Sequence, residues 1–243
     1  MRVAGKSDTG RSRSANEDSL LIDERIGLLA VADGMGGHAG GSVASHLAVG
    51  ALGAYLTQGL DNGLANADPE ALLKRAFGAA DQSIVQKAKE DDSLKEMAST
   101  LVAALVNGTS VHLAHLGDSR AYLIRPEQGI GRLTEDHSLV QEMVNEGRIT
   151  ESAAKNHRLR NVVTHCLGGG RFEEPEVSKL DLCPGATLLL CSDGLTTMVE
   201  DEDILRIVRR SGSDVKAACG KLVDLANKRG GKDNVSVILA LYE

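Results

Sequence analysis

The feature that most constrains the fold is a hairpin signal in the middle of the chain. Two apolar segments, LVAALV and VHLAHL, flank the dipeptide Asn107–Gly108. Asn-Gly favours a tight hairpin turn because both residues readily adopt positive φ. A turn at residues 117–119 then leads into a third apolar segment, AYLIR. We therefore expect an antiparallel meander here.

Two consecutive helices are expected before this meander. Residues 19–23 and 27–33 form short apolar runs that indicate a first pair of strands. Apolar residues then recur at helical spacing over 43–56 and again over 69–92, where Asp68 is placed to cap the second helix. Two helices in succession exclude a strictly alternating strand–helix fold, so the predicted fold class is α+β.

The second half of the chain continues this mixture. Its expected elements are a helix at 137–145, a polar, mobile loop or flap at 147–170, a buried strand at 187–193, helices at 202–210 and 214–228, and a final strand at 235–242. The chain contains no repeat, low-complexity tract or linker. We therefore expect one domain that spans residues 1–243.

Composition excludes several classes of function. The net charge is −7, and the only aromatic residues are three Tyr and two Phe, so we expect no nucleic-acid partner. No apolar run approaches the roughly 18 residues of a membrane span, and the N-terminus lacks a signal-peptide core, so we expect no membrane partner. The four cysteines have no zinc-like spacing and are interpreted as reduced thiols of a cytoplasmic protein.

Acidic residues gather where the apolar runs stop. Asp33, Asp118 and Asp193 each follow such a run, and Asp233 immediately precedes the last one. Asp-Gly and Asp-Asn are also ordinary turn dipeptides, so each acid alone could simply mark a turn. If the carboxylates converge, however, a pair of charges about 4 Å apart costs about 4 kcal/mol at an effective dielectric of about 20. A hard cation such as Mg²⁺ or Mn²⁺ would offset that repulsion.

Six sequence blocks together resemble a known family. They are Asp8–Asp18, Val31–His38, Leu116–Arg120, Leu133–Ser138, Cys191–Leu195 and Lys232–Val235. In this order they resemble the type 2C (PPM family) metal-dependent protein serine/threonine phosphatases of the compact bacterial kind. The resemblance implies a four-layer α-β-β-α sandwich, in which two packed antiparallel sheets are flanked by helix pairs.

The resemblance also implies the ligands of two Mn²⁺ or Mg²⁺ ions and of a third, weaker ion. The implied ligands are Asp33, Asp193 and Asp233 for the first ion, Asp33 and the Gly34 carbonyl with Glu17 and Asp18 for the second, and Asp118 with Asp193 for the third. Arg13 would bind the substrate phosphate, and His38 would protonate the leaving oxygen. A water activated by the two ions would attack the phosphorus.

The same resemblance implies phosphorylated proteins as substrates. The implied partners are a bacterial Ser/Thr kinase and its substrates, including a protein with a forkhead-associated domain, in growth, stress or type VI secretion control. We expect a monomer. Two departures from the family pattern stand out: Ala98-Ser99-Thr100 replaces Gly-Thr-Thr, and residues 148–160 match the family flap only in position and polarity.

Three other interpretations remain open. Residues 34–39 fit G-x-G-x-x-A, a dinucleotide-binding pattern, although a second helix rather than a parallel strand is expected next. Residues 166–171 resemble the Cys-to-Arg loop of tyrosine phosphatases but are one residue short. A protein with this fold could also be a binding module without activity, although such a module would not need every acid.

Overall fold

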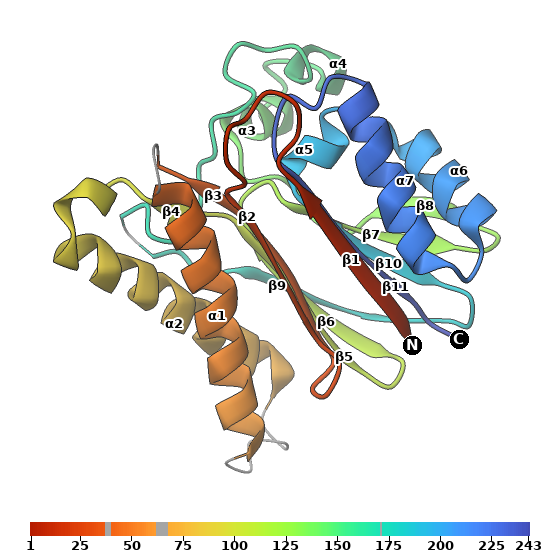
Figure 1. The fold of residues 1–243 in the computed structure, drawn as a ribbon, viewed down its shortest axis with the longest axis horizontal. Coiled ribbons are helices and arrows are strands. Elements are labelled where there is room, and N and C mark those ends of the chain that lie inside the picture. Colours follow the sequence, from red (N-terminus) through yellow and green to blue (C-terminus); the bar gives the residue numbers. More distant parts are fainter. Residues whose placement is uncertain (37–39, 62–67, 171) are drawn as a thin grey trace.

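The computed structural model describes residues 1–36, 40–61, 68–170 and 172–243. Within these ranges the chain forms two β-sheets with helices on their outer faces (Figure 1). Every strand pair that the structure describes in the two sheets is antiparallel. This arrangement confirms the α+β class and lacks the parallel strand pair that a dinucleotide-binding unit requires.

The first sheet joins the two ends of the chain. Its five strands have the order β1-β11-β10-β7-β8. Their bounds are β1 Arg2–Asp8, β7 Arg120–Arg125, β8 Gly129–Arg132, β10 Thr187–Cys191 and β11 Val235–Leu241. Strand β1 pairs with β11 from Arg2 opposite Leu241 to Asp8 opposite Val235, so Asp8 lies at the end of the sheet where β11 begins.

The second sheet contains the predicted strand pair and the predicted hairpin. It has six strands, ordered β2-β3-β5-β6-β9, with β4 paired to β3. Their bounds are β2 Asp18–Asp23, β3 Leu28–Met35, β4 Ala98–Ser99, β5 Leu101–Asn107, β6 Ser110–Leu116 and β9 Glu176–Asp181. The Asn107–Gly108 turn joins β5 to β6 as expected, with Gly108 at a φ of 62°.

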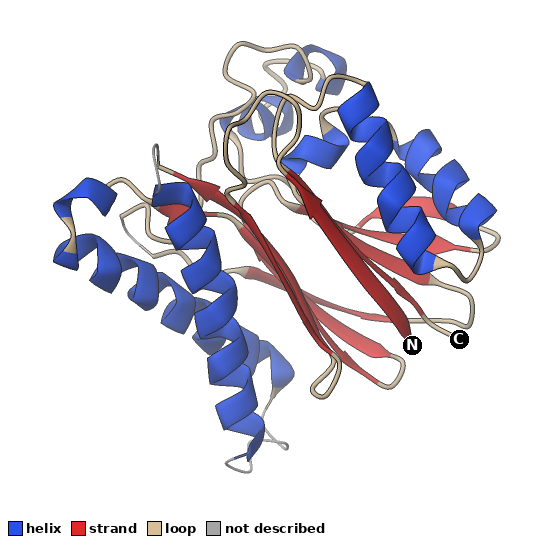
Figure 2. Ribbon diagram, viewed as in Figure 1, coloured by secondary structure: helices blue, strands red, loops and turns tan. Residues whose placement is uncertain are grey.

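Helices cover both sheets and give four layers (Figure 2). The helices are α1 Gly40–Asp61, α2 Pro69–Glu90, α3 Leu139–Asn145, α4 Glu151–Ala154, α5 Asp193–Thr196, α6 Asp201–Ser211 and α7 Val215–Lys228, with a 3₁₀ turn at Asp92–Leu94. Helices α1 and α2 pack on the second sheet, and α6 and α7 on the first. A third apolar cluster fills the space between the sheets. The predicted sandwich is confirmed.

The strand directions bring the predicted acids to one end of the sandwich. Asp33 lies near the end of β3 and pairs with Asp18 at the start of β2. Asp118 lies in the turn between β6 and β7, and Asp193 follows β10. Asp233 precedes β11, whose first residues lie beside the last residues of β10. In Figure 1 this is the upper end, where α5 and the longest loops are drawn.

The strands missed by sequence analysis are short or lie at edges. Strands β1, β8 and β9 are edge strands with few buried residues, so their sequences lack a strong apolar pattern. The flap region contains α4 and is anchored by bridges from Ser138 to Val163 and from Ser99 to Leu167. The segment between the two predicted helices, residues 59–67, is rich in Gly, Asn and Asp as expected of a loop, and most of it lies outside the described residues. No described helix is long and apolar enough to cross a membrane.

Candidate metal centre

One cavity of about 410 Å³ lies at the acidic end of the sandwich. Of the residues predicted for the site, the cavity is lined by Arg13, Glu17, Asp33, Gly34, Asp118, Asp193 and Asp233. Asn161 and Val163 of the flap also line it. Asp18 is buried beside the lining residues, where its Oδ2 accepts a hydrogen bond of 2.8 Å from Ser192. His38 lies outside the described residues.

Burial and mutual repulsion raise the pKa values of the clustered carboxyls. Loss of solvent is the largest cause at each of them. It raises the pKa of Asp18 to about 7 and that of Asp193 to about 6, with the neighbouring charge of Asp233 adding to both shifts. The pKa values of Asp33 and Asp118 are also raised well above the ordinary range by burial, and Asp193 is a further cause at both. The part of these shifts that comes from neighbouring carboxylates shows that the side chains lie close together.

Two carboxylate oxygens in this cluster have no hydrogen-bond partner. They are Oδ1 of Asp18 and Oδ1 of Asp193, and both are buried. An unpartnered buried carboxylate oxygen is costly unless a cation binds it. Because the donor set is made of carboxylates with the Gly34 carbonyl nearby, it suits hard divalent cations with oxygen ligands. The residues present therefore fit Mg²⁺ or Mn²⁺.

Gly34 is required by its surroundings. A Cβ atom at this position would lie 1.9 Å from the Gly41 carbonyl oxygen and 2.7 Å from the Glu17 carbonyl oxygen. The Gly34 N–H donates to that same Glu17 oxygen over 3.1 Å. The close approach lets the start of α1 and the end of β3 meet beside the cavity, which places the Gly34 main chain among the acids.

Arg13 supplies positive charge at the rim of the cavity. Its side chain is half exposed and donates a 2.9 Å hydrogen bond from Nη2 to Asp233, while Nη1 lies 3.9 Å from Glu17. The hydrogen bond to Asp233 raises the pKa of the Arg13 guanidinium further. A planar guanidinium in this place can offer two parallel N–H groups to phosphate oxygens above the acids.

Asn234 holds the loop that carries Arg13 and Glu17. Its buried amide donates 2.9 Å hydrogen bonds to the carbonyls of Thr9 and Ala15 and accepts a 2.8 Å hydrogen bond from the Glu17 N–H. Its own main-chain N–H donates to Asp233 over 2.8 Å. One side chain therefore sets the position of the loop relative to Asp233, and sequence analysis assigned it no role.

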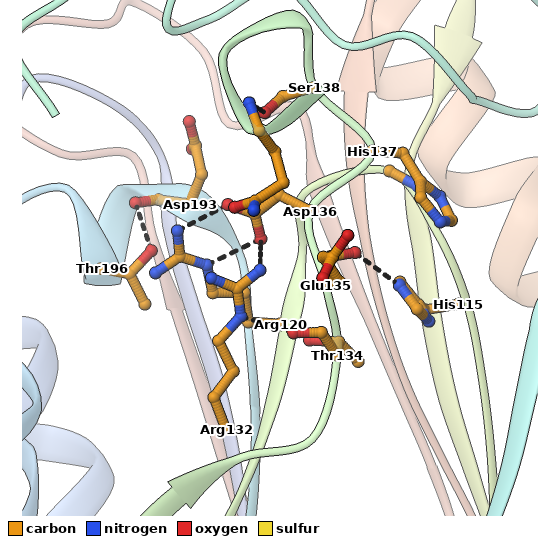
Figure 3. A network of polar contacts seen from close by, with 12 residues as sticks. His115, Arg120, Arg132, Thr134, Glu135, Asp136, His137, Ser138, Asp193 and Thr196 are labelled. Atoms are coloured by element: carbon orange, nitrogen blue, oxygen red, sulfur yellow. Dashed lines mark hydrogen bonds and ion pairs between the residues drawn. The ribbon is translucent and has the colours of Figure 1, made fainter. Parts of the chain in front are cut away.

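An internal network of ion pairs lies close to Asp193 (Figure 3). Arg120 donates to both oxygens of Asp136 over 2.8 and 2.6 Å, and Arg132 donates to one of them over 2.8 Å. Two guanidinium groups on one carboxylate leave a net positive charge. The Arg120 charge lowers the pKa values of Asp118 and Asp193, but the Asp136 charge raises both, so the network offsets little of the larger effect of burial.

A second group of possible metal ligands lies beside this network, at His115, His137 and Glu176. The hydrogen bonds of the rings argue against a metal there. His137 Nδ1 accepts from the Gly117 N–H over 3.2 Å, so its proton is on Nε2, which faces Glu176 at 3.3 Å. His115 Nε2 donates to the Glu135 carbonyl over 2.8 Å. Both Nε2 atoms thus carry protons, and the group is structural.

The thiol interpretation of residues 166–171 finds no support. Cys166 does not line the cavity, and burial raises the pKa of its thiol. A nucleophilic cysteine needs a lowered pKa. Arg171 lies outside the described residues.

A two-sheet sandwich with a buried carboxylate cluster at one end is the arrangement that the comparisons with known proteins identify. The family profile of protein phosphatase 2C matches residues 7–235. Serine/threonine protein phosphatase PstP of Mycobacterium tuberculosis is 39% identical over 240 residues, which cover 99% of this chain and 45% of PstP. Serine/threonine phosphatase stp of Listeria monocytogenes is 35% identical over 243 residues, covering 98% of this chain and 95% of that protein. The chain belongs to the protein phosphatase 2C family.

A solved structure extends the comparison to metal. The crystal structure of the PstP catalytic domain in complex with two manganese ions is 37% identical, with a TM-score of 0.86, and the match covers 98% of this chain and 96% of that one. The chain spans about half the length of PstP itself. Family and fold are thus shown, and manganese is the ion present in a close structural relative.

The raised pKa values predict how pH affects the protein in EDTA. Asp193 binds protons more tightly in the folded than in the unfolded state, so its ionisation destabilises the fold as pH rises from about 4 through about 6. Asp193→Asn removes this effect. We expect the variant to melt at a higher temperature than wild type at about pH 7.5, with the difference vanishing near pH 4. Calorimetry measures both, and a difference independent of pH would contradict the assignment.

The contacts of Asn234 predict a selective loss of substrate binding. Asn234→Ala removes three hydrogen bonds that hold the Arg13 loop, so we expect the KM for a phosphopeptide to rise about tenfold. Asn227→Ala is the comparison variant: Asn227 is also buried, and it donates over 2.9 Å to Asp8 Oδ1, which holds only the Gly10 N–H at the start of that loop. Steady-state kinetics distinguish them. Equal KM values for the two variants would show that Asn234 has no special role.

Proposed function

We propose that this chain hydrolyses phosphoserine and phosphothreonine esters on proteins with the help of two Mn²⁺ or Mg²⁺ ions. The observation that carries the proposal is the cluster of buried carboxylates with unpartnered oxygens, in a cavity with Arg13 at its rim. Membership of the family and the manganese complex of a relative support it. When bound, the ions would polarise the phosphate and lower the pKa of the attacking water.

The acidic residues of the chain would be divided among the ions as their ligands. Asp33, Asp193 and Asp233 would hold the first ion, and Asp33 and the Gly34 carbonyl the second, with Glu17 and Asp18 beside it. Asp118 and Asp193 would hold a third, weaker ion. Convergence of these residues in or beside the cavity supports this division. Because an ion neutralises charges that now repel one another, its binding would stabilise the fold.

Arg13 and His38 would act on the substrate. Arg13 would exchange its hydrogen bond with Asp233 for phosphate oxygens, since both acceptors are anionic and the side chain is half exposed. His38 would donate a proton to the leaving serine or threonine oxygen, a role that suits imidazole near neutral pH. Asp33 would serve the reaction by holding both core ions.

The remaining expectations extend this proposal. We propose residues 1–243 as a single catalytic domain, monomeric and cytoplasmic, whose four free cysteines suit a reducing compartment. The partners would be a Ser/Thr kinase of the same bacterial cell and that kinase's substrates, including a forkhead-associated-domain protein. Because the relatives PstP and stp are serine/threonine phosphatases, phosphoproteins are the substrate class we propose.

Phosphate release from a phosphothreonine peptide tests the function. We expect wild type to release phosphate with Mn²⁺ or Mg²⁺ and to stop in EDTA. Asp193→Asn should lose at least about 100-fold in rate, because it removes a ligand of the ions. Cys166→Ser is the control and should match wild type.

Two results would contradict the proposal. Activity that persists in EDTA and disappears in Cys166→Ser would assign the reaction to a thiolate. Absence of phosphate release under every condition, with no rise in melting temperature on adding Mn²⁺, would favour a binding module. A functional metal site should instead stabilise the fold by about 2.7 kcal/mol at a hundredfold excess of ion over its Kd.

A further inference from the structure

A pair of buried hydroxyl groups lies between two of the carboxylate-bearing segments. Thr100 Oγ1 and Ser119 Oγ are 2.7 Å apart, and each residue is 1% exposed. Thr100 follows β4 and lines the cavity, whereas Ser119 follows Asp118 in the turn between β6 and β7. The pair therefore links the residue after β4 to the turn that carries Asp118, and both lie far from Asp33 in sequence.

On one side, Thr100 and its neighbour fix the main chain of Asp33. The Asp33 N–H donates to Thr100 Oγ1 over 3.0 Å, and the Thr100 N–H donates to the Asp33 carbonyl over 2.9 Å. The Ser99 hydroxyl lies within hydrogen-bond distance of two carbonyl oxygens, that of Thr100 at 2.8 Å and that of Asp33 at 3.1 Å. The N–H and the carbonyl of Asp33 are thus both held in this segment, in which Ser99 departs from the Gly-Thr-Thr pattern and Thr100 keeps it.

On the other side, Thr100 contacts the turn that carries Asp118. Gly117 has a φ of 105°, and a Cβ atom there would lie 2.6 Å from both Cβ and Cγ2 of Thr100. The methyl side of Thr100 therefore packs against Gly117 while its hydroxyl reaches Ser119. These two contacts hold the turn immediately before and immediately after Asp118.

The hydroxyl pair continues the hydrogen bonding that begins at Asp33. Thr100 Oγ1 accepts from the Asp33 N–H, and it shares a further hydrogen bond with Ser119 Oγ in which either hydroxyl can be the donor. The result is a continuous sequence from the Asp33 peptide through Thr100 to Ser119. Buried hydrogen bonds in such a sequence strengthen one another, and removing one member leaves its partner unsatisfied.

We propose that Thr100 and Ser119 act as one positioning unit, which sets Asp33 and Asp118 at the separation that the bound ions require. The proposal rests on the metal site of the proposed function. In this role the two hydroxyls do not contact the substrate. Their loss should weaken ion binding in addition to any loss of stability of the metal-free protein.

Mn²⁺-dependent melting tests this unit without measuring activity. The quantity is the Mn²⁺ concentration that gives half of the maximal rise in melting temperature. We expect it to rise about tenfold in Thr100→Val, because the Asp33 N–H loses its acceptor, and about threefold in Ser119→Ala. In the double variant we expect no more than the tenfold rise of Thr100→Val, since one substitution already breaks the unit.

Two further variants separate positioning from packing. Thr100→Ser keeps the hydroxyl and should stay within about twofold of wild type. Thr187→Val makes the same change at another buried threonine. Thr187 begins β10, at the end of that strand away from Asp193, so the variant should leave the half-maximal Mn²⁺ concentration unchanged. If Thr100→Val does not fold, Ser119→Ala carries the test in its place.

Three results would overturn the inference. The first is a half-maximal Mn²⁺ concentration that is the same as in wild type for Thr100→Val or for Ser119→Ala. The second is a double variant in which this concentration rises roughly thirtyfold, the product of the single effects, and the third is a Thr100→Ser variant that binds Mn²⁺ as weakly as Thr100→Val. If wild type itself gains no stability from Mn²⁺, the proposed metal site fails as well. A wild type that responds and a Thr100→Val that matches it would reject the positioning unit alone.

Discussion

Repulsion among buried carboxylates is the constraint on which this structure depends. Asp18, Asp118 and Asp193 each raise the pKa of Asp33, and all four carboxyls are removed from water. A cluster of this kind opposes folding unless protons or cations neutralise it. The arrangement makes sense as a site that divalent ions complete, and the Arg120–Asp136–Arg132 network and Arg13 provide only part of the compensating charge.

The scaffold resists this repulsion through the main chain. Two packed antiparallel sheets bring strand ends from distant parts of the sequence to one edge, and hydrogen bonds then fix the loops that follow them. Asn234 ties the N-terminal loop to Asp233, Ser192 holds Asp18, and Thr100 holds Asp33. These polar groups are themselves buried, so each loses a partner if the loop moves. Uncharged neighbours therefore help to position Asp18, Asp33 and Asp233.

Much of the fold could be predicted from the sequence, as could the convergence of most of the proposed ligands on one cavity. The Asn107–Gly108 hairpin and the capped helix after Asp68 carry strong local signals, and both were confirmed. Strand β9 could not be predicted in this way, because an exposed edge strand has no apolar alternation to reveal it. The acids were found from their places at strand ends. Asn234 and Thr100 were not, because their roles arise from contacts with residues about 220 and 67 positions away, respectively, which no local pattern encodes.

The most direct test of this account is a crystal structure of the protein grown with Mn²⁺, with anomalous diffraction used to locate the ions. We expect two strong peaks among Asp33, Asp193, Asp233 and the Gly34 carbonyl, with Arg13 no longer paired with Asp233 when a phosphate analogue is bound. Peaks at His115, His137 and Glu176 with none among the acids would contradict the account, because the buried carboxylates would then have no cation to offset their repulsion.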